Sequence, residues 1–344
     1  MSRRSFVLRL VLSLSVAALL VVLLFRFGGV RPADAARTLL SLSPWTFALA
    51  FGLHVATYCL RAARFQALIP AVARPRFRHA LTVSAAHNLA SYVLPLKTGE
   101  AALIVYLRLQ CGTPAGVALA ALLVSRFLDA ASLCAGLAAA CFVLRGEGAA
   151  PRWMGAASVL LLALAALFLL LSLRGDLLVR FLGGALRWLR LHRLRPGARL
   201  LEKLGGLAVA LRAASGGWRL AYSAFLTAPM WFTIFGFYAL LAGAFGVPES
   251  VGFLERALGA SLAALFNLLP MNAMAGAGTQ ELGWVAGFHG VLGVEEGVAL
   301  SSGLAVHLVQ LFNIVVMGLL AHLAMGVMPR WPLPGGGRAS DDKL

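Results

Sequence analysis

Long apolar runs are the feature of this sequence that most limits its fold. Six runs have more than 20 residues each: 6–27, 44–69, 115–144, 153–173, 218–244 and 297–327. Each is long enough to cross the roughly 30 Å hydrocarbon core of a bilayer as a helix. The whole chain is 60% hydrophobic and 12% charged, whereas soluble domains have about 45–50% and about 25%. The sequence therefore predicts an all-α polytopic membrane protein and excludes a soluble enzyme or a disordered chain.

Two further apolar stretches, 79–110 and 253–290, are interrupted by helix breakers. The first contains Pro95 and Gly99, and the second contains Pro270 and the glycines of 276–278. The pieces after the breaks, 99–110 and 278–290, would each extend only about 18–20 Å, too short to cross alone. We expect two re-entrant hairpins of half-helices, because a bilayer tolerates broken backbone only where protein or a cavity surrounds it.

The distribution of charge predicts the orientation of the spans. With both termini in the cytoplasm, the predicted cytoplasmic segments carry 22 basic and four acidic residues, and the outer segments carry six of each. This follows the positive-inside rule, so the net charge of +17 indicates topology and not a nucleic-acid partner. The two hairpins then enter from opposite sides. The halves 6–144 and 153–327 are therefore expected to form an inverted repeat, an architecture common in transporters.

The predicted organisation is a single integral membrane domain over 1–328, followed by a flexible cytoplasmic tail, 329–344, with no appended soluble domain. A basic cytoplasmic loop, 174–217, separates two of the spans. Residues 180–191 of this loop have the pattern of a basic amphipathic helix on the cytoplasmic leaflet. The alternative is a positive-inside anchor with no recognition role.

Ionisable residues at membrane depth are costly and usually face a cavity or each other. The predicted layout leaves five there: Lys97, Glu100, Arg126, Asp129 and Glu281. Glu100 and Glu281 fall in the first turns of half-helices that start at Gly99 and Gly278, where free N–H groups favour an anion. Each glutamate could instead cap its own helix or pair with an arginine.

Polar residues on the spans extend the candidate site. Arg126 and Asp129 share one helical face, so they either neutralise each other or Arg126 binds a phosphate while Asp129 orients it. On the last span, His307, Gln310 and Asn313 share a face, with His307 as a proton carrier or as hydrogen-bonded structure. Arg61 and Arg64 could bind substrate or extend to headgroups. The possible accessory residues are Arg61, Arg64, Asn88, Asn267 and His307.

Enzyme signatures are missing from the sequence. It has no HExxH and no P-loop, and Ser301 and Ser302 lie on one helix with His307, a poor arrangement for a nucleophile and base. We expect no enzyme activity, no cofactor and no metal site. The spacing of Gly283 and Gly287 could bring helices close together, but such a match is expected by chance among 36 glycines.

Four segments carry a resemblance to a known family: RAARFQALI from Arg61, NLASYVLPLKTGE from Asn88, SRFLDAASL from Ser125 and NLLPMNAMAGAGTQELG from Asn267. In this order they resemble the flippase-like transmembrane domain of the lysylphosphatidylglycerol synthase family, over about 6–327. The resemblance implies the membrane part alone, without the aminoacyltransferase domain, in a bacterial inner membrane. In two places the sequence departs from the family pattern: 271–275 fills part of the second hairpin motif, and His307 stands where an arginine is often found.

The resemblance implies a flippase-like protein that moves an anionic, aminoacylated or polyprenyl-phosphate-linked lipid across the membrane. The expected substrate-binding residues are Lys97, Gly99, Glu100, Arg126, Asp129, Gly278 and Glu281. The expected partners are membrane lipids and a separate lipid-modifying enzyme, without nucleic acid. Two alternatives stay open: a non-transporting scaffold or regulatory subunit of an envelope-modifying enzyme, and a transporter of a small solute.

Overall fold

The computed structural model describes residues 32–94, 98–146, 153–268 and 278–329, together with isolated positions between 11 and 22. Within these segments the chain is helical and contains no strand. The predicted first span, 6–27, the breaks around Pro95 and Pro270, and nearly all of the tail lie outside the described residues.

Five helices in the described segments are long and apolar enough to cross a membrane. They are α3 (Pro44–Leu68), α6 (Ala115–Gly146), α7 (Trp153–Trp188), α9 (Trp218–Ala244) and α12 (Glu296–Val327). Their positions agree with five of the predicted spans, and α9 has the predicted bounds. Local chemistry explains where α3 begins, because Ser43 accepts a hydrogen bond from the backbone N–H of Thr46 and Pro44 occupies the first turn. The protein is a multi-pass membrane protein.

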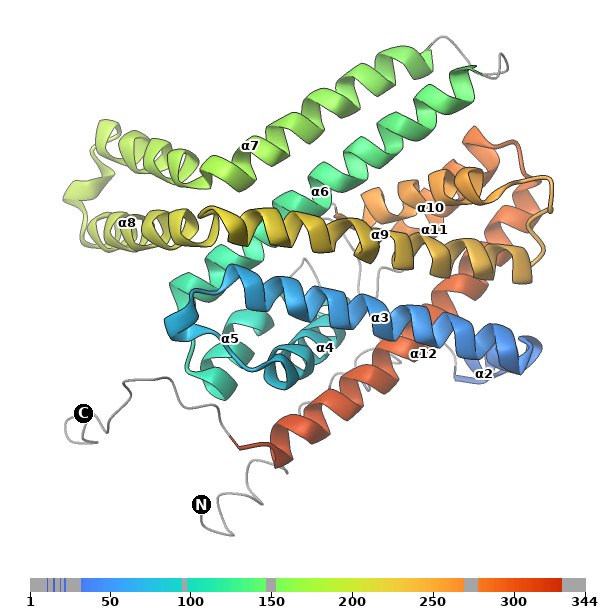
Figure 1. The fold of residues 1–344 in the computed structure, drawn as a ribbon, viewed down its shortest axis with the longest axis horizontal. Coiled ribbons are helices and arrows are strands. Elements are labelled where there is room, and N and C mark those ends of the chain that lie inside the picture. Colours follow the sequence, from blue (N-terminus) through green and yellow to red (C-terminus); the bar gives the residue numbers. More distant parts are fainter. Residues whose placement is uncertain are drawn as a thin grey trace.

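The two interrupted stretches form pairs of short helices. The first pair is α4 (Phe77–Val93) and α5 (Glu100–Cys111), and the second is α10 (Phe253–Leu268) and α11 (Thr279–Val285), which continues into a π-helical turn, η5 (Ala286–Val291). The members of each pair pack against each other, and the two pairs lie on opposite sides of the molecule (Figure 1). The short helices η1 (Ala71–Ala73) and α2 (Pro32–Ser41) precede α4 and α3, and α2 contacts α12.

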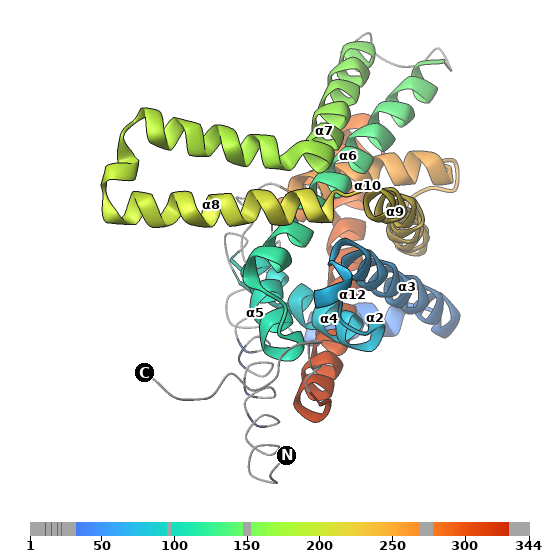
Figure 2. The ribbon, with the colours of Figure 1, turned by 60° about the vertical axis from the view of Figure 1, so that its left-hand side comes forward.

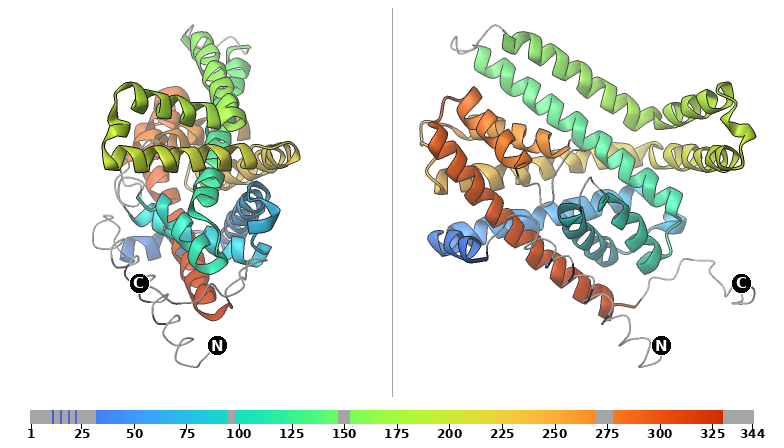
Figure 3. Two further views of the ribbon diagram at one scale, coloured as in Figure 1. Left: turned by 90° about the vertical axis from the view of Figure 1, so that its left-hand side faces the viewer. Right: turned by 180° about the vertical axis from the view of Figure 1, so that it is seen from behind.

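The long helices hold the two pairs together. Helix α3 packs along α9, α6 contacts both α5 and α10, and α12 contacts both α4 and α11. The view from behind in Figure 3 shows α12 crossing the molecule from the α10–α11 side to the α4–α5 side. As a result, residues near the inner ends of both pairs lie next to the same spanning helices.

Helix α7 is longer than the predicted span 153–173. It continues to Trp188 through a kink at Arg174, whose backbone has φ −132° and ψ 30°. The following helices are η3 (Leu191–Arg193) and α8 (Arg195–Ala214), and α8 packs back against α7 and α6. The predicted basic loop is thus a helical hairpin (Figure 2). Because 153–188 contains no proline, the helix continues past the end of the apolar run.

Two glycines allow a close approach between α10 and the helix that follows it. A Cβ atom on Gly283 would lie 2.7 Å from the Cα atom of Ala263, and one on Gly287 would lie 2.2 Å from the carbonyl oxygen of Gly259. Interpreting the Gly283–Gly287 spacing as a chance match was therefore wrong, because both positions have space only for glycine.

Candidate functional site

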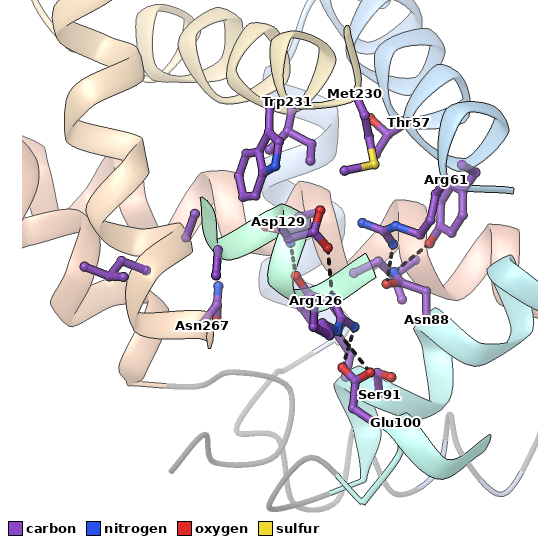
Figure 4. Close-up of a pocket in the computed structure, with 18 of the residues that line it drawn as sticks. Thr57, Arg61, Asn88, Ser91, Glu100, Arg126, Asp129, Met230, Trp231 and Asn267 are labelled. Atoms are coloured by element: carbon purple, nitrogen blue, oxygen red, sulfur yellow. Dashed lines mark hydrogen bonds and ion pairs between the residues drawn. The ribbon is translucent and has the colours of Figure 1, made fainter. Parts of the chain in front are cut away.

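A cavity of about 610 Å³ lies among α3, α4, α6, α9, α10 and α12, with single lining residues from α5 and α7. Its polar lining includes Arg61, Asn88, Glu100, Arg126 and Asp129, which lie close to one another in Figure 4. Its apolar lining includes Cys134, Phe168, Trp231 and Leu265. Along α6, Cys134 is about 12 Å beyond Arg126, given the helical rise. The cavity can therefore hold a ligand that has a charged group and an apolar portion.

Glu100 and Arg126 form a two-point ion pair at the polar part of this cavity. Both carboxylate oxygens of Glu100 accept hydrogen bonds from Arg126, one from Nε at 3.2 Å and the other from a terminal nitrogen. The position of Glu100 in the first turn of α5 brings its carboxylate to α6. Glu100 was expected to bind an anion at its helix start, to cap its own helix or to pair with an arginine, and the structure shows the pairing with an arginine. A charged ligand that approaches Arg126 would compete with this carboxylate.

Asp129 is held mainly by Arg64 and not by Arg126. The two terminal nitrogens of Arg64 donate to the two carboxylate oxygens of Asp129 at 2.6 and 3.0 Å, whereas Arg126 is 3.5 Å away. Arg64 is only 1% exposed and also donates to Thr227 at 3.2 Å. Arg64 therefore does not extend to headgroups. It supports Asp129 from behind the cavity.

Arg61 differs from the other two arginines in its partners. It donates to the side-chain oxygen of Asn88 at 2.9 Å, and Asn88 donates to the hydroxyl of Tyr58 at 2.8 Å. Among the described residues, no carboxylate lies within 4.0 Å of Arg61, and its buried Nε has no hydrogen-bond partner. Counted over the part of the chain that the structure describes, three arginines and two carboxylates thus leave one excess positive charge around the cavity, which favours an anion.

A second polar network surrounds Gln310 on α12. Its side-chain oxygen accepts from Gln280 at 2.8 Å and from the hydroxyl of Tyr238 at 3.2 Å, and its nitrogen donates to the hydroxyl of Tyr92. Asn267 donates to Gln280 at 3.0 Å. Tyr92 lies near the end of α4 and Gln280 near the start of α11. The inner ends of both helix pairs therefore meet at one side chain.

Glu281 has a different environment from Glu100. One of its carboxylate oxygens accepts from the backbone N–H of Gly278 at 2.8 Å, which caps α11, and the other is hydrogen-bonded to His307 Nδ1. The positive φ of Gly278, 80°, is a conformation that side-chain-bearing residues avoid. The sequence separation is 26 residues for both Glu100–Arg126 and Glu281–His307. In both helix pairs, a glutamate of the second short helix thus pairs with a basic residue on the next long helix.

Some of the predicted site residues meet at the cavity and others do not. Those that line it are Arg61, Asn88, Glu100, Arg126, Asp129 and Asn267. Those that lie elsewhere are Arg64, Gly99, Gly278, Glu281 and His307, and Lys97 is outside the described residues. The lining residues that the sequence analysis missed include five whose aromatic rings carry a polar atom: His54, Tyr58, Tyr92, Trp231 and Tyr238. The sequence feature that pointed to them was an aromatic ring with a polar atom inside an apolar run.

No cluster of three metal-ligating side chains occurs within the described segments. A comparison with curated proteins finds no match. The lysylphosphatidylglycerol synthase TM region, a membrane domain, matches residues 7–318. This range includes all the cavity residues and nearly all of the five apolar helices. The chain therefore belongs to the lysylphosphatidylglycerol synthase TM region family.

Proposed function

We propose that this protein moves a lipid with an anionic, phosphate-bearing headgroup across the membrane. The observation that carries the proposal is the cavity with one excess positive charge, an unpartnered arginine N–H and an adjoining apolar part. A charged site at membrane depth is costly unless a ligand or a counter-ion uses it. The apolar lining favours a lipid over a small hydrophilic solute, whose path would need polar groups along its whole length.

The headgroup would bind next to Arg61 and Arg126. A phosphate there could accept from the free Nε of Arg61 and replace Glu100 as the partner of Arg126, a forked donor that suits phosphate oxygens. Asp129, fixed by Arg64, would keep Arg126 in place. The sequence suggested a headgroup midway between Gly99 and Gly278. The position proposed here is closer to the first helix pair, because the carboxylate of Glu281 already occupies the N-terminus of α11. Lys97 and Asn267 complete the proposed set. Transport needs no chemical step, so we assign no catalytic residue, metal or cofactor.

The architecture we propose is six full spans and two oppositely inserted re-entrant hairpins within one integral domain, 1–328. An inverted repeat of 6–144 and 153–327 is supported by the packing. In this repeat, α3, α4, α5 and α6 correspond in order to α9, α10, α11 and α12. The contact of α4 with α12 then corresponds to the contact of α10 with α6, and the contact of α5 with α6 corresponds to that of α11 with α12. All four contacts are present. Alternating access would then be a rocking of the halves around the cavity while the acyl chains stay in lipid.

We further propose a bacterial inner membrane location with both termini in the cytoplasm. The support is the basic hairpin after α7, which carries ten of the 30 basic residues between 174 and 219. Cytoplasmic segments of membrane proteins have such an excess of arginine and lysine.

The test is lipid translocation by the purified protein in liposomes, with a fluorescent phosphatidylglycerol and a dithionite readout. We expect Arg126→Ala and Arg61→Gln to lower the rate at least about tenfold, a change that corresponds to about 1.4 kcal/mol. Arg108→Gln is the matched control, because this exposed arginine lies outside the cavity. Monodisperse elution in detergent shows whether each variant is folded. Wild-type rates in both cavity variants would overturn the proposal.

Two other functions predict different results in the same liposomes. A small-solute transporter would take up solute without moving lipid, and a scaffold for a lipid-modifying enzyme would keep its effect on that enzyme in Arg126→Ala. The excess positive charge inside the cavity is the reason that we favour lipid movement over a scaffold.

A further inference from the structure

The hairpin formed by 175–188 of α7 and by α8 has an orientation unlike that of the spans. In Figure 2, α9 is seen nearly end-on, whereas both arms of the hairpin are seen from the side. The hairpin therefore runs across the direction of the spanning helix. If α9 crosses the bilayer, the hairpin lies along the membrane surface at the C-terminal end of α7. We call 175–214 the interfacial hairpin.

The α7 arm of the interfacial hairpin exposes a continuous apolar stripe. Phe181 is 73% exposed and Trp188 is 83% exposed. At 100° per residue, the stripe falls on one side of the helix; its members within α7 are Leu177, Leu178, Phe181, Leu182 and Trp188, and the exposed Leu189 follows the end of the helix. Val179, on another side of the arm, is buried in a core that includes Ala208 and Leu211 of α8. The stripe therefore points away from the protein, and none of the described residues covers it.

The charges of the hairpin indicate what kind of surface would cover the stripe. Segment 174–219 has ten basic residues and only two acidic ones, Asp176 and Glu202. Asp176 is buried, 3.0 Å from Arg212 and 3.5 Å from Arg180. An exposed apolar stripe on a strongly cationic helix is typical of segments that lie in the interface of an anionic membrane.

A groove of about 340 Å³ between the two arms provides a place for headgroups. Arg180 and Arg187 line it from α7, and Gly183 and Gly205 contribute no side chain to its walls. The two arginines are two helical turns apart on the same side as the groove. Their forked donors match phosphate oxygens. The groove is therefore suited to the phosphate of an anionic phospholipid whose chains enter the bilayer beside the apolar stripe.

The base of the hairpin is tied to the membrane part of α7. Next to the kink at Arg174, the carbonyl of Ser172 accepts a hydrogen bond from the hydroxyl of Ser215 at 2.6 Å. Arg212 of α8 reaches Asp176 just beyond the kink. These contacts fix the direction of the hairpin, so the stripe and the groove are presented together and do not require a disordered segment to fold.

We propose that the interfacial hairpin is a binding surface for an anionic phospholipid leaflet. The apolar stripe inserts among the acyl chains, and Arg180 and Arg187 bind headgroup phosphates. This site is distinct from the central cavity and does not depend on the transport proposed above. It predicts that the hairpin distinguishes anionic from zwitterionic bilayers.

The experiment uses the full-length protein in nanodiscs of phosphatidylcholine, with and without phosphatidylglycerol. Either lipid carries bromine near the headgroup end of its chains, which quenches nearby tryptophan. Subtracting the fluorescence of the Trp188→Phe variant from that of the wild type separates the contribution of Trp188 from that of the other six tryptophans. We expect strong quenching of Trp188 and preferential quenching by brominated phosphatidylglycerol. Because an arginine near an anionic surface contributes about fivefold, Arg180→Gln with Arg187→Gln should abolish that preference. Arg190→Gln with Arg193→Gln is the matched control, with the same charge change outside the groove.

Three results would overturn the proposal. An unquenched Trp188 in every nanodisc would mean that the stripe lies outside the bilayer and serves another partner. Equal loss of preference in the two double variants would mean that only total charge matters and that the groove is no site. Displacement of brominated phosphatidylglycerol from Trp188 by inorganic phosphate would assign the groove to free phosphate instead of lipid. Since none of these readouts measures translocation, the outcome is independent of the flippase test.

Discussion

Arg64 on α3 and Asp129 on α6 are 65 residues apart in the chain, yet they form a two-point ion pair with N–O distances of 2.6 and 3.0 Å. Both side chains are buried, at 1% and 5% exposure. The pair joins α3 to α6 directly behind the cavity. Its geometry lets Arg126, one helical turn before Asp129, face the cavity with Glu100.

Removing one partner of this pair should destabilise the protein strongly. Arg64→Met leaves the Asp129 carboxylate buried opposite a methyl group, and Asp129→Leu leaves the guanidinium unpaired. Loss of one partner of a buried ion pair costs about 3–5 kcal/mol. Thermal unfolding in detergent measures the effect. The double variant should recover part of the loss, and a double variant less stable than both single ones would contradict this account.

Glu100→Gln should increase the affinity of the cavity for an anionic lipid. The change removes the carboxylate that competes with a phosphate for Arg126 and raises the excess positive charge around the cavity by one. We expect about tenfold stronger retention of phosphatidylglycerol, equivalent to about 1.4 kcal/mol, with slower release. Native mass spectrometry of the purified protein measures retention. Glu281→Gln makes the same change outside the cavity and should leave retention unaltered, so an equal increase in both variants would count against the assigned cavity.

Gly287→Ala should disrupt the packing of η5 on α10. The new methyl group would lie 2.2 Å from the carbonyl oxygen of Gly259, and the backbone at that position cannot move as a side chain can. Overpacking of this kind costs about 1–3 kcal/mol. Gly290→Ala, in the same element, is the control, because nothing lies within 4 Å of its added Cβ. Equal unfolding temperatures for the two variants would mean that the helices are not in close contact.

His307→Arg should be tolerated, whereas His307→Leu should not. Arginine could keep a charged hydrogen bond with Glu281 and reproduce the pairing of Arg126 with Glu100 in the other half. Leucine removes the hydrogen-bonding group and leaves Glu281, whose side chain is 13% exposed, without its partner on α12. Leaving a buried polar group unsatisfied costs about 1–3 kcal/mol. Unfolding temperatures should therefore decrease from wild type to His307→Arg to His307→Leu. A lower unfolding temperature for His307→Arg than for His307→Leu would argue against the pairing.

The spanning helices could be predicted because hydropathy and length are local properties. Helix α9 occupies the predicted 218–244, and α12 begins one residue before the predicted 297. The end of α7 could not be predicted in this way, because a helix can continue beyond the end of its apolar run. At 174–188 the chain keeps its helical hydrogen bonds beyond the kink and packs against α8.

The candidate site was predictable in its residue types but not in its pairings. Spacing alone placed Arg126 next to Asp129, but Asp129 binds Arg64, which approaches from another helix. Trp231 and Tyr238 line the cavity on α9, but the polar atom on each ring does not by itself distinguish a ring that faces a cavity from one that faces lipid. Such pairings depend on how helices far apart in the sequence come together.

The hydrogen bonds of Gln310 impose a condition on any motion of the helices around it. One amide side chain bridges α4, α9 and α11 from α12, so these four helices cannot separate at this depth while the amide keeps all three partners. Leaving a buried polar group without a partner costs about 1–3 kcal/mol. In the proposed transport, separating these helices would require breaking hydrogen bonds of Gln310, and a bound headgroup that offers new hydrogen-bonding groups there would lower that cost. Occupancy of the cavity and freedom of movement would then be coupled through a single side chain.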